Sequence, residues 1–158
     1  MATGANAAGA QSRTGSDYGG RTPAQWFCLI VGAVLVLAGI LGFITDSSFD
    51  TGNALNGDKL LGLEVNGWHN IVHIASGAFL LAMMGKRSTA KTGALAFGAI
   101  YVVVTIIGFA DGSDIFGLLP INGADNVLHL VLAIAGIGAA LASTADDRAV
   151  SRTAGAGA

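Results

Sequence analysis

NGWHNIVH at residues 66–73 and NGADNVLH at residues 122–129 are the two stretches of this sequence that decide its fold. Asn, Gly, Asn and His recur in them at the same offsets, 56 residues apart. Both stretches open long apolar runs, where a buried Asn or His costs free energy unless it finds a hydrogen-bond partner. Apolar residues interchange freely in such runs, so the recurrence of these polar residues predicts a polar cluster that is built twice, with its two copies facing each other.

The composition predicts that most of the surface does not meet water. The chain has 158 residues, of which 53% are hydrophobic and 11% charged, and its mean hydropathy is +0.64. A soluble domain carries about a quarter charged residues. The 24 glycines suit close helix packing in lipid, and the single cysteine, Cys28, excludes an intrachain disulfide. We therefore expect an integral membrane protein. Its net charge of −2 gives no reason to expect a nucleic-acid partner.

Four apolar segments are each long enough to cross a bilayer. They are expected to be helices at about 24–44, 67–84, 93–110 and 124–143. At about 1.5 Å per residue such segments span about 27–32 Å, against a hydrocarbon core of about 30 Å. Residues 22–144 are therefore predicted to form one four-helix transmembrane domain. The small and polar residues of 1–21 and 145–158 are expected to be disordered cytoplasmic tails.

Charge placement predicts the orientation in the membrane. Seven of the eight basic residues fall on one side of the expected spans: Arg13, Arg21, Lys86, Arg87, Lys91, Arg148 and Arg152. Lys59 alone falls on the other side, among acidic residues. Because Lys and Arg collect in cytoplasmic loops, both termini should be cytoplasmic and the loops at about 45–66 and 111–123 should face outward. The Ala- and Gly-rich tails are typical of a GC-rich bacterial source, so we expect a multi-pass protein of the bacterial plasma membrane.

The duplication extends beyond the two polar stretches. The first span ends with ILGF at residues 40–43, and the third ends with IIGF at residues 106–109, each followed closely by Asp and Ser. The predicted fold class is therefore an all-α membrane protein, a four-transmembrane-helix bundle made of two duplicated helical hairpins. Two hairpins of the same orientation form a parallel repeat about an axis along the membrane normal.

Helical spacing predicts which polar residues act together. Residues at i and i+3 or i+4 share a face, and the Asn residues that precede the second and fourth spans are N-cap candidates. We predict a structural polar cluster of Asn66, Asn70, His73, Asn122, Asn126 and His129. Such a cluster would hydrogen-bond across the bundle and fix its register. This interpretation favours an accessory or scaffold subunit of unknown activity over an enzyme, and no residue is assigned a catalytic role.

Two other interpretations stay open, although a protein without a cofactor is favoured over both. If the two hairpins pack about a pseudo-twofold axis, His73 and His129 lie at matched depth, and they are candidate axial ligands of a haem. A divalent metal such as Zn²⁺ has the candidate ligands His69, His73, His129 and Asp125. The other interpretation is a small-solute or proton transporter, because ionisable residues within a membrane often mark such paths. The apolar inner halves of the spans argue against a complete relay.

At these residues the chain resembles a family of small four-helix membrane proteins from actinobacteria, catalogued as a domain of unknown function. The resemblance covers about residues 24–143 and rests on GWHNIVH at residues 67–73, followed by Gly77, with the Asn-x-x-His motif echoed by DNVLH at residues 125–129. It implies the bundle as the fold and brings no activity, substrate or cofactor. The DoxX-like four-helix proteins are similar in shape only. The expected partners are the lipid bilayer and a larger membrane complex or a second copy of the chain.

Overall fold

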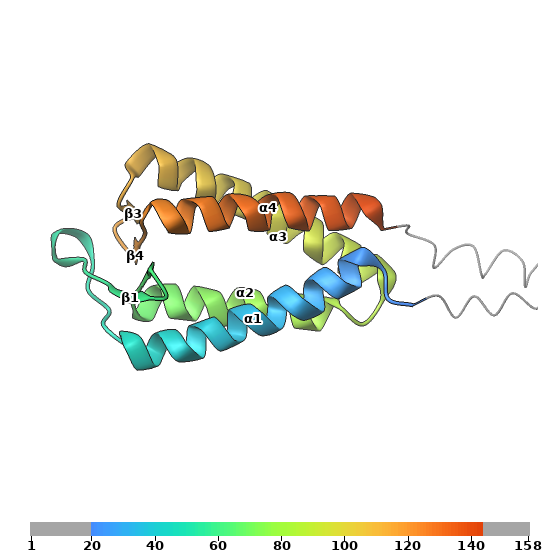
Figure 1. The fold of residues 1–158 in the computed structure, drawn as a ribbon, viewed down its shortest axis with the longest axis horizontal. Coiled ribbons are helices and arrows are strands. Elements are labelled where there is room, and N and C mark those ends of the chain that lie inside the picture. Colours follow the sequence, from blue (N-terminus) through green and yellow to red (C-terminus); the bar gives the residue numbers. More distant parts are fainter. Residues whose placement is uncertain (1–19, 144–158) are drawn as a thin grey trace, which may run out of the picture.

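The computed structural model describes residues 20–143, so the expected tails lie outside the described residues except for Gly20 and Arg21. The described part contains four α-helices: α1 (Pro23–Thr45), α2 (Gly67–Met83), α3 (Arg87–Asp111) and α4 (Gly123–Ala142). Figure 1 shows α1 beside α2 and α3 beside α4, and the helices of each pair are antiparallel. We call the end at which α1 begins and α4 ends the terminal end, and the opposite end the hairpin end.

Two short β-hairpins at the hairpin end correct the all-α prediction. A 3₁₀ turn (Gly52–Ala54) and then β1 (Asp58–Leu60) paired with β2 (Leu63–Val65) connect α1 to α2, while β3 (Asp114–Ile115) paired with β4 (Leu119–Pro120) connects α3 to α4. Each tip holds an apolar residue and a glycine with positive φ: Leu61 (54°) and Gly62 (89°), and Phe116 (57°) and Gly117 (66°). Leu and Phe are uncommon in the left-handed conformation that such turns require. The residues at these tips therefore gave no sequence signal for a turn, and the strands on either side were not predicted.

Local capping explains where the helices begin. Thr22 and Gln25 form a capping box, with Pro23 at the first position of α1. The third helix begins at Arg87, ahead of the apolar span expected from residue 93, because its first turns are polar. Hydropathy locates the apolar part of this helix and not its beginning.

Three of the helices are long and apolar enough to cross a membrane: α1, α3 and α4, with 23, 25 and 20 residues. The fourth, α2, has 17 residues and does not meet the same length criterion. The described part of the chain is therefore mostly helical, with three candidate membrane spans.

Glycines bring the helices of each pair into backbone contact. A Cβ atom added to Gly77 in α2 would lie 2.6 Å from the carbonyl oxygen of Gly32 in α1. In the other pair, a Cβ atom added to Gly136 in α4 would lie 2.9 Å from the carbonyl oxygen of Ala94 in α3. Small residues permit this close packing, which is the main attraction between helices in lipid.

An apolar core joins the two pairs near the terminal end. Phe27 of α1 meets Phe97 of α3 edge to face, with ring centroids 5.7 Å apart. Cys28, Leu80 and Ala94 are fully buried in the same cluster. The pairs separate toward the hairpin end in Figure 1, and the functional site described below lies there.

Two glycines on α4 give a matched test of this packing. We expect Gly136→Ala to destabilise the protein by about 1–3 kcal/mol, because the new methyl group meets the backbone of α3. A Cβ atom at Gly138 meets nothing within 4 Å, so Gly138→Ala should be neutral or stabilise the helix by up to about 1 kcal/mol. Unfolding in detergent, followed by circular dichroism, measures both. Equal effects of the two substitutions would contradict the close contact between α3 and α4.

Candidate functional site, a histidine-lined cavity between the helix pairs

The two N-cap asparagines connect the helix pairs at the hairpin end. Each side-chain oxygen caps its own helix, Asn66 capping α2 and Asn122 capping α4. Each side-chain nitrogen crosses to the other half of the molecule. Asn66 Nδ2 donates to the carbonyl oxygen of Leu118 (2.9 Å), and Asn122 Nδ2 donates to that of Gly62 (3.0 Å). Each amide therefore binds the turn region of the opposite β-hairpin.

The residues at the third position of α2 and α4 make a second pair of crossed contacts. His69 Nδ1 lies 3.2 Å from the carbonyl oxygen of Pro120, so this nitrogen carries the hydrogen. The Asp125 carboxylate accepts the backbone N–H of Glu64 (3.0 Å) and also that of Asn122 (2.9 Å). The backbone of Pro120 offers only an acceptor, whereas the backbone of Glu64 offers a donor. The third residue of α2 must therefore be a donor, and the third residue of α4 must be an acceptor.

Asn70 and Asn126 each form a hydrogen bond between the two helices of one pair. Asn70 Nδ2 donates to the carbonyl oxygen of Asp46 at the end of α1 (2.8 Å), and Asn126 Nδ2 donates to that of Gly108 near the end of α3 (3.0 Å). Both Oδ1 atoms are buried without a hydrogen-bond partner among the described residues. They pack against Gly42 and Gly108, where an added Cβ atom would overlap them. These amides therefore set the contact between neighbouring helices.

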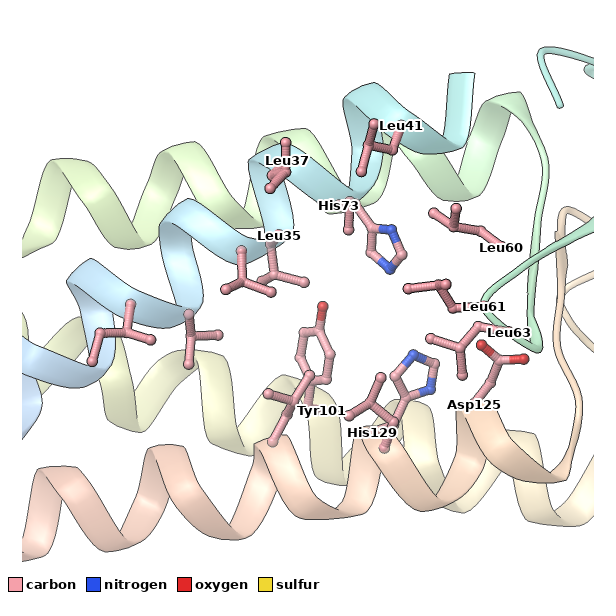
Figure 2. A pocket seen from close by; sticks show the side chains of 16 residues that line it. Leu35, Leu37, Leu41, Leu60, Leu61, Leu63, His73, Tyr101, Asp125 and His129 are labelled. Carbon is pink, nitrogen blue, oxygen red and sulfur yellow. The ribbon is translucent and has the colours of Figure 1, made fainter. Parts of the chain in front are cut away.

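A cavity of about 340 Å³ lies between the pairs, on the side formed by α1 and α4. Figure 2 shows His73, Tyr101 and His129 pointing into it from α2, α3 and α4. Leu61 of the β1–β2 hairpin and Asp125 line the end of the cavity that is nearest the hairpin end. The rest of the lining is aliphatic, so polar chemistry is confined to one part of the wall.

His73, Tyr101 and His129 also line a second cavity of about 100 Å³, on the side formed by α2 and α3. These three side chains therefore separate the larger space from the smaller one. Their rings contact other rings: His129 meets Tyr101 nearly at right angles with centroids 5.5 Å apart, and His73 lies 4.5 Å from His69. Tyr101 in turn stacks on Phe97, with centroids 4.0 Å apart.

The protein leaves hydrogen-bonding capacity unused at this wall. The Nδ1 atoms of His73 and His129 are buried and have no partner among the described residues. The side chain of His129 is 6% exposed. A buried polar atom without a partner costs about 1–3 kcal/mol, and a ligand that rearranges these rings and hydrogen-bonds to them would recover part of that cost.

The structure divides the predicted polar cluster into two groups with different neighbours. The four asparagines contact backbone carbonyls and amides, whereas His73 and His129 face the cavity. His69 joins the asparagines at the hairpin end through its bond to Pro120. Tyr101 was not singled out from the sequence, although a tyrosine in the middle of an apolar span is itself a signal of a polar interior.

The three histidines among the candidate metal ligands lie near one another, with the ring centroid of His69 4.5 Å from that of His73 and 6.1 Å from that of His129. Among residues 20–143, no group of three or more His, Cys, Asp or Glu residues has an arrangement that could hold a metal ion. One oxygen of Asp125, Oδ2, accepts both of the backbone N–H bonds that this carboxylate receives. The two histidines that were candidates for haem ligation, His73 and His129, both reach the larger cavity.

Fold and site together describe a helical protein with three helices apolar enough to cross a membrane and a cavity between its helix pairs. The chain belongs to the DUF4383 family, a domain of unknown function whose family model matches residues 25–142. No curated protein and no solved structure significantly matches this chain. Membership in an uncharacterised family agrees with the resemblance found from the sequence, while the actinobacterial origin and the diagnostic value of the Asn-x-x-His motif stay expectations.

The contact between Asn126 and Gly108 can be tested by a double-mutant cycle. Gly108→Ala should destabilise the protein because its methyl group overlaps the amide of Asn126. The same substitution should cost about 1–2 kcal/mol less in an Asn126→Ala background, where the overlap with the amide is removed and the flexible end of Ile121, 2.8 Å from the added Cβ atom, still has to shift. Gly138→Ala, far from this contact, should be additive with Asn126→Ala. Detergent unfolding measures the four variants, and additivity of both pairs would contradict the proposed contact.

Proposed function

We propose that the protein is a four-span membrane protein that binds a small lipophilic molecule in the cavity between its helix pairs. The observation that carries this proposal is the mainly aliphatic 340 Å³ cavity, with two imidazoles in its wall whose buried Nδ1 atoms have no hydrogen-bond partner among residues 20–143. Small-molecule sites have volumes of about 300–1,000 Å³ and are mostly apolar, with a few polar groups that orient the ligand. The asparagine contacts supply the frame that holds this site open.

The chain direction supports a fourth span. The apolar helices α1 and α3 both run from the terminal end to the hairpin end. If both cross the membrane, the chain has to return between them, and α2 is the segment that makes the return. Its 17 residues lie at the lower limit of about 17–25 residues for a spanning helix. The result is the four-helix bundle of two repeated hairpins.

Charge supports an orientation with the terminal end in the cytoplasm. Arg21, Lys86, Arg87 and Lys91 lie at or near that end, while Lys59 lies in the β1–β2 hairpin. Positively charged residues favour the cytoplasmic side. The cavity then lies in the outer half of a bacterial plasma membrane, beneath the two β-hairpins.

The cavity is open to the surface that would meet lipid tails. Val34 and Leu37 of α1 line it and are 58% and 56% exposed, and Leu128 of α4 lines it and is 39% exposed. Exposed apolar side chains at an opening of this kind favour a ligand that enters from the bilayer and not from water. Toward the terminal end, the Phe27–Phe97 core fills the space between the pairs, which argues against solute or proton transport.

Binding without catalysis fits an accessory subunit that holds a ligand for a larger membrane complex or for a second copy of the chain. A second candidate is haem, supported by the two histidines that face one cavity from α2 and α4. Both candidates use the same space, so one purified sample distinguishes them. An absorbance scan that shows a Soret band would favour haem, and a colourless sample from haem-supplemented cells would remove it.

Cysteine labelling tests the orientation. The only native cysteine, Cys28, is fully buried, and its thiol donates to the carbonyl oxygen of Ala90. We expect Asn53→Cys to react with a membrane-impermeant maleimide in intact cells, because this loop lies at the hairpin end. Gly85→Cys, in the turn between α2 and α3, should react only after the cells are permeabilised. The opposite pattern would contradict cytoplasmic termini.

Filling the cavity tests the binding function. Ala38 lines the cavity on α1, whereas Ala33 on the same helix is exposed and does not line it. We expect Ala38→Trp to lose a lipophilic molecule that co-purifies with the wild type in mild detergent, and Ala33→Trp to retain it. Solvent extraction followed by mass spectrometry compares the three samples. Identical extracts from all three would argue against an occupied cavity.

A further inference from the structure

We propose that the ligand of this cavity has a quinone-type head, a flat ring with an oxygen atom at each of two opposite positions, attached to an apolar tail. This inference rests on the proposed function, because it specifies the class of molecule bound at the same site. It follows from the placement of the polar groups, the sign of the charge beside them and the shape of the aliphatic wall.

The polar groups of the wall are distributed over three helices. His73, Tyr101 and His129 extend from α2, α3 and α4 toward one space in Figure 2, with the Tyr101 hydroxyl between the two imidazoles. A neutral imidazole has one N–H and one acceptor nitrogen, so each histidine can donate to an oxygen atom of the head, whereas the Tyr101 hydroxyl already has the Ser76 side chain as a hydrogen-bond partner. A head with a single polar atom would satisfy one of these groups. A ring with oxygen atoms at opposite positions reaches groups that extend from different helices.

The charge near the cavity disfavours an anionic head. Asp125 lines the cavity near the hairpin end and is 3% exposed. No lysine or arginine among residues 20–143 lines the same space. A fatty-acid carboxylate or a lipid phosphate would lie near a buried carboxylate without a compensating cation, which is unfavourable in a medium of low dielectric constant. The head should therefore be neutral and carry its polarity as oxygen atoms.

The shape of the polar wall favours a flat head. His73, Tyr101 and His129 stand as a partition of rings between the larger and the smaller cavity. His129 and Tyr101 already pack edge to face, and Tyr101 stacks on Phe97. Aromatic rings pack favourably in offset or edge-to-face arrangements, and a planar head continues this series of contacts. A bulky saturated head would contact the same rings less well.

The remaining wall fits an apolar tail. Val34, Leu37 and Leu41 of α1 line the cavity and are also exposed at its opening. They connect the polar wall with the lipid-facing surface of the helix pairs. A tail can therefore leave the cavity between α1 and α4 and continue into the bilayer, while the head stays beside the histidines.

The experiment measures ligand occupancy of the full chain in lipid nanodiscs by native mass spectrometry. The probes are decylubiquinone, decylbenzene, which has the same tail and a ring without oxygen atoms, and decanoic acid, which has an anionic head. We expect the wild type to prefer decylubiquinone over decylbenzene by at least about tenfold, the effect of one or two hydrogen bonds. Decanoic acid should bind most weakly.

The histidine variants locate the recognition. We expect His73→Leu and His129→Leu each to weaken decylubiquinone binding about tenfold and to leave decylbenzene binding unchanged. His129→Gln keeps a donor and an acceptor, so it should retain part of the preference for the quinone. Asn53→Ala, in the exposed loop, is the neutral control. Circular dichroism of each variant confirms that it is folded, and the Gln variant keeps the test valid if a Leu variant does not fold.

The possible failures are distinct. If decylubiquinone and decylbenzene bind equally and Ala38→Trp removes both, the cavity binds lipophiles but the quinone-type head is wrong. Tighter binding of decanoic acid would also overturn the inferred head. If Ala38→Trp does not reduce the binding of any probe, both the proposed binding function and the inferred quinone-type head are wrong.

Discussion

The crossed hydrogen bonds at the hairpin end are the constraint on which the rest of the structure depends. Asn66 and Asn122 cap their own helices and at the same time bind the β-hairpin of the opposite pair. An amide buried among apolar helices has few other partners, so each half of the molecule completes the hydrogen bonding of the other. The aromatic core joins the pairs at the opposite end. The cavity lies between these two joined ends, in the part of the molecule that neither the asparagine contacts nor the core side chains fill.

The close packing within each pair explains why the asparagines and histidines separate. Three residues along an α-helix correspond to about 300°, so Asn70 and His73 point about 60° apart. In a helix that touches its partner through glycine backbones, this difference is enough to direct the amide into the pair and the imidazole between the pairs. The same offset holds for Asn126 and His129. One short motif therefore supplies both a structural contact and a cavity wall.

Much of this arrangement could be predicted from the sequence, and the remainder depends on contacts that are distant along the chain. Local signals predicted the N-caps at Asn66 and Asn122, and hydropathy located the apolar parts of the helices. The turns at Leu61 and Phe116 could not be predicted, because their left-handed conformation is stabilised by the surrounding structure and not by the residue type. The contribution of Tyr101 and the division of the polar cluster depend on which helices become neighbours, and helical spacing alone does not specify this.

The crossed contacts also make each half of the chain incomplete without the other. The contacts between α1 and α2 are local in sequence, so the first pair can form while the second is still being synthesised. The side-chain nitrogen of Asn66, however, has no partner until Leu118 of the β3–β4 hairpin arrives, and the backbone N–H of Glu64 has none until Asp125 of α4 arrives. The first half alone therefore leaves these two hydrogen-bonding groups without the partners that the second half supplies. The second half supplies these partners and also the Tyr101 and His129 side chains in the wall of the cavity.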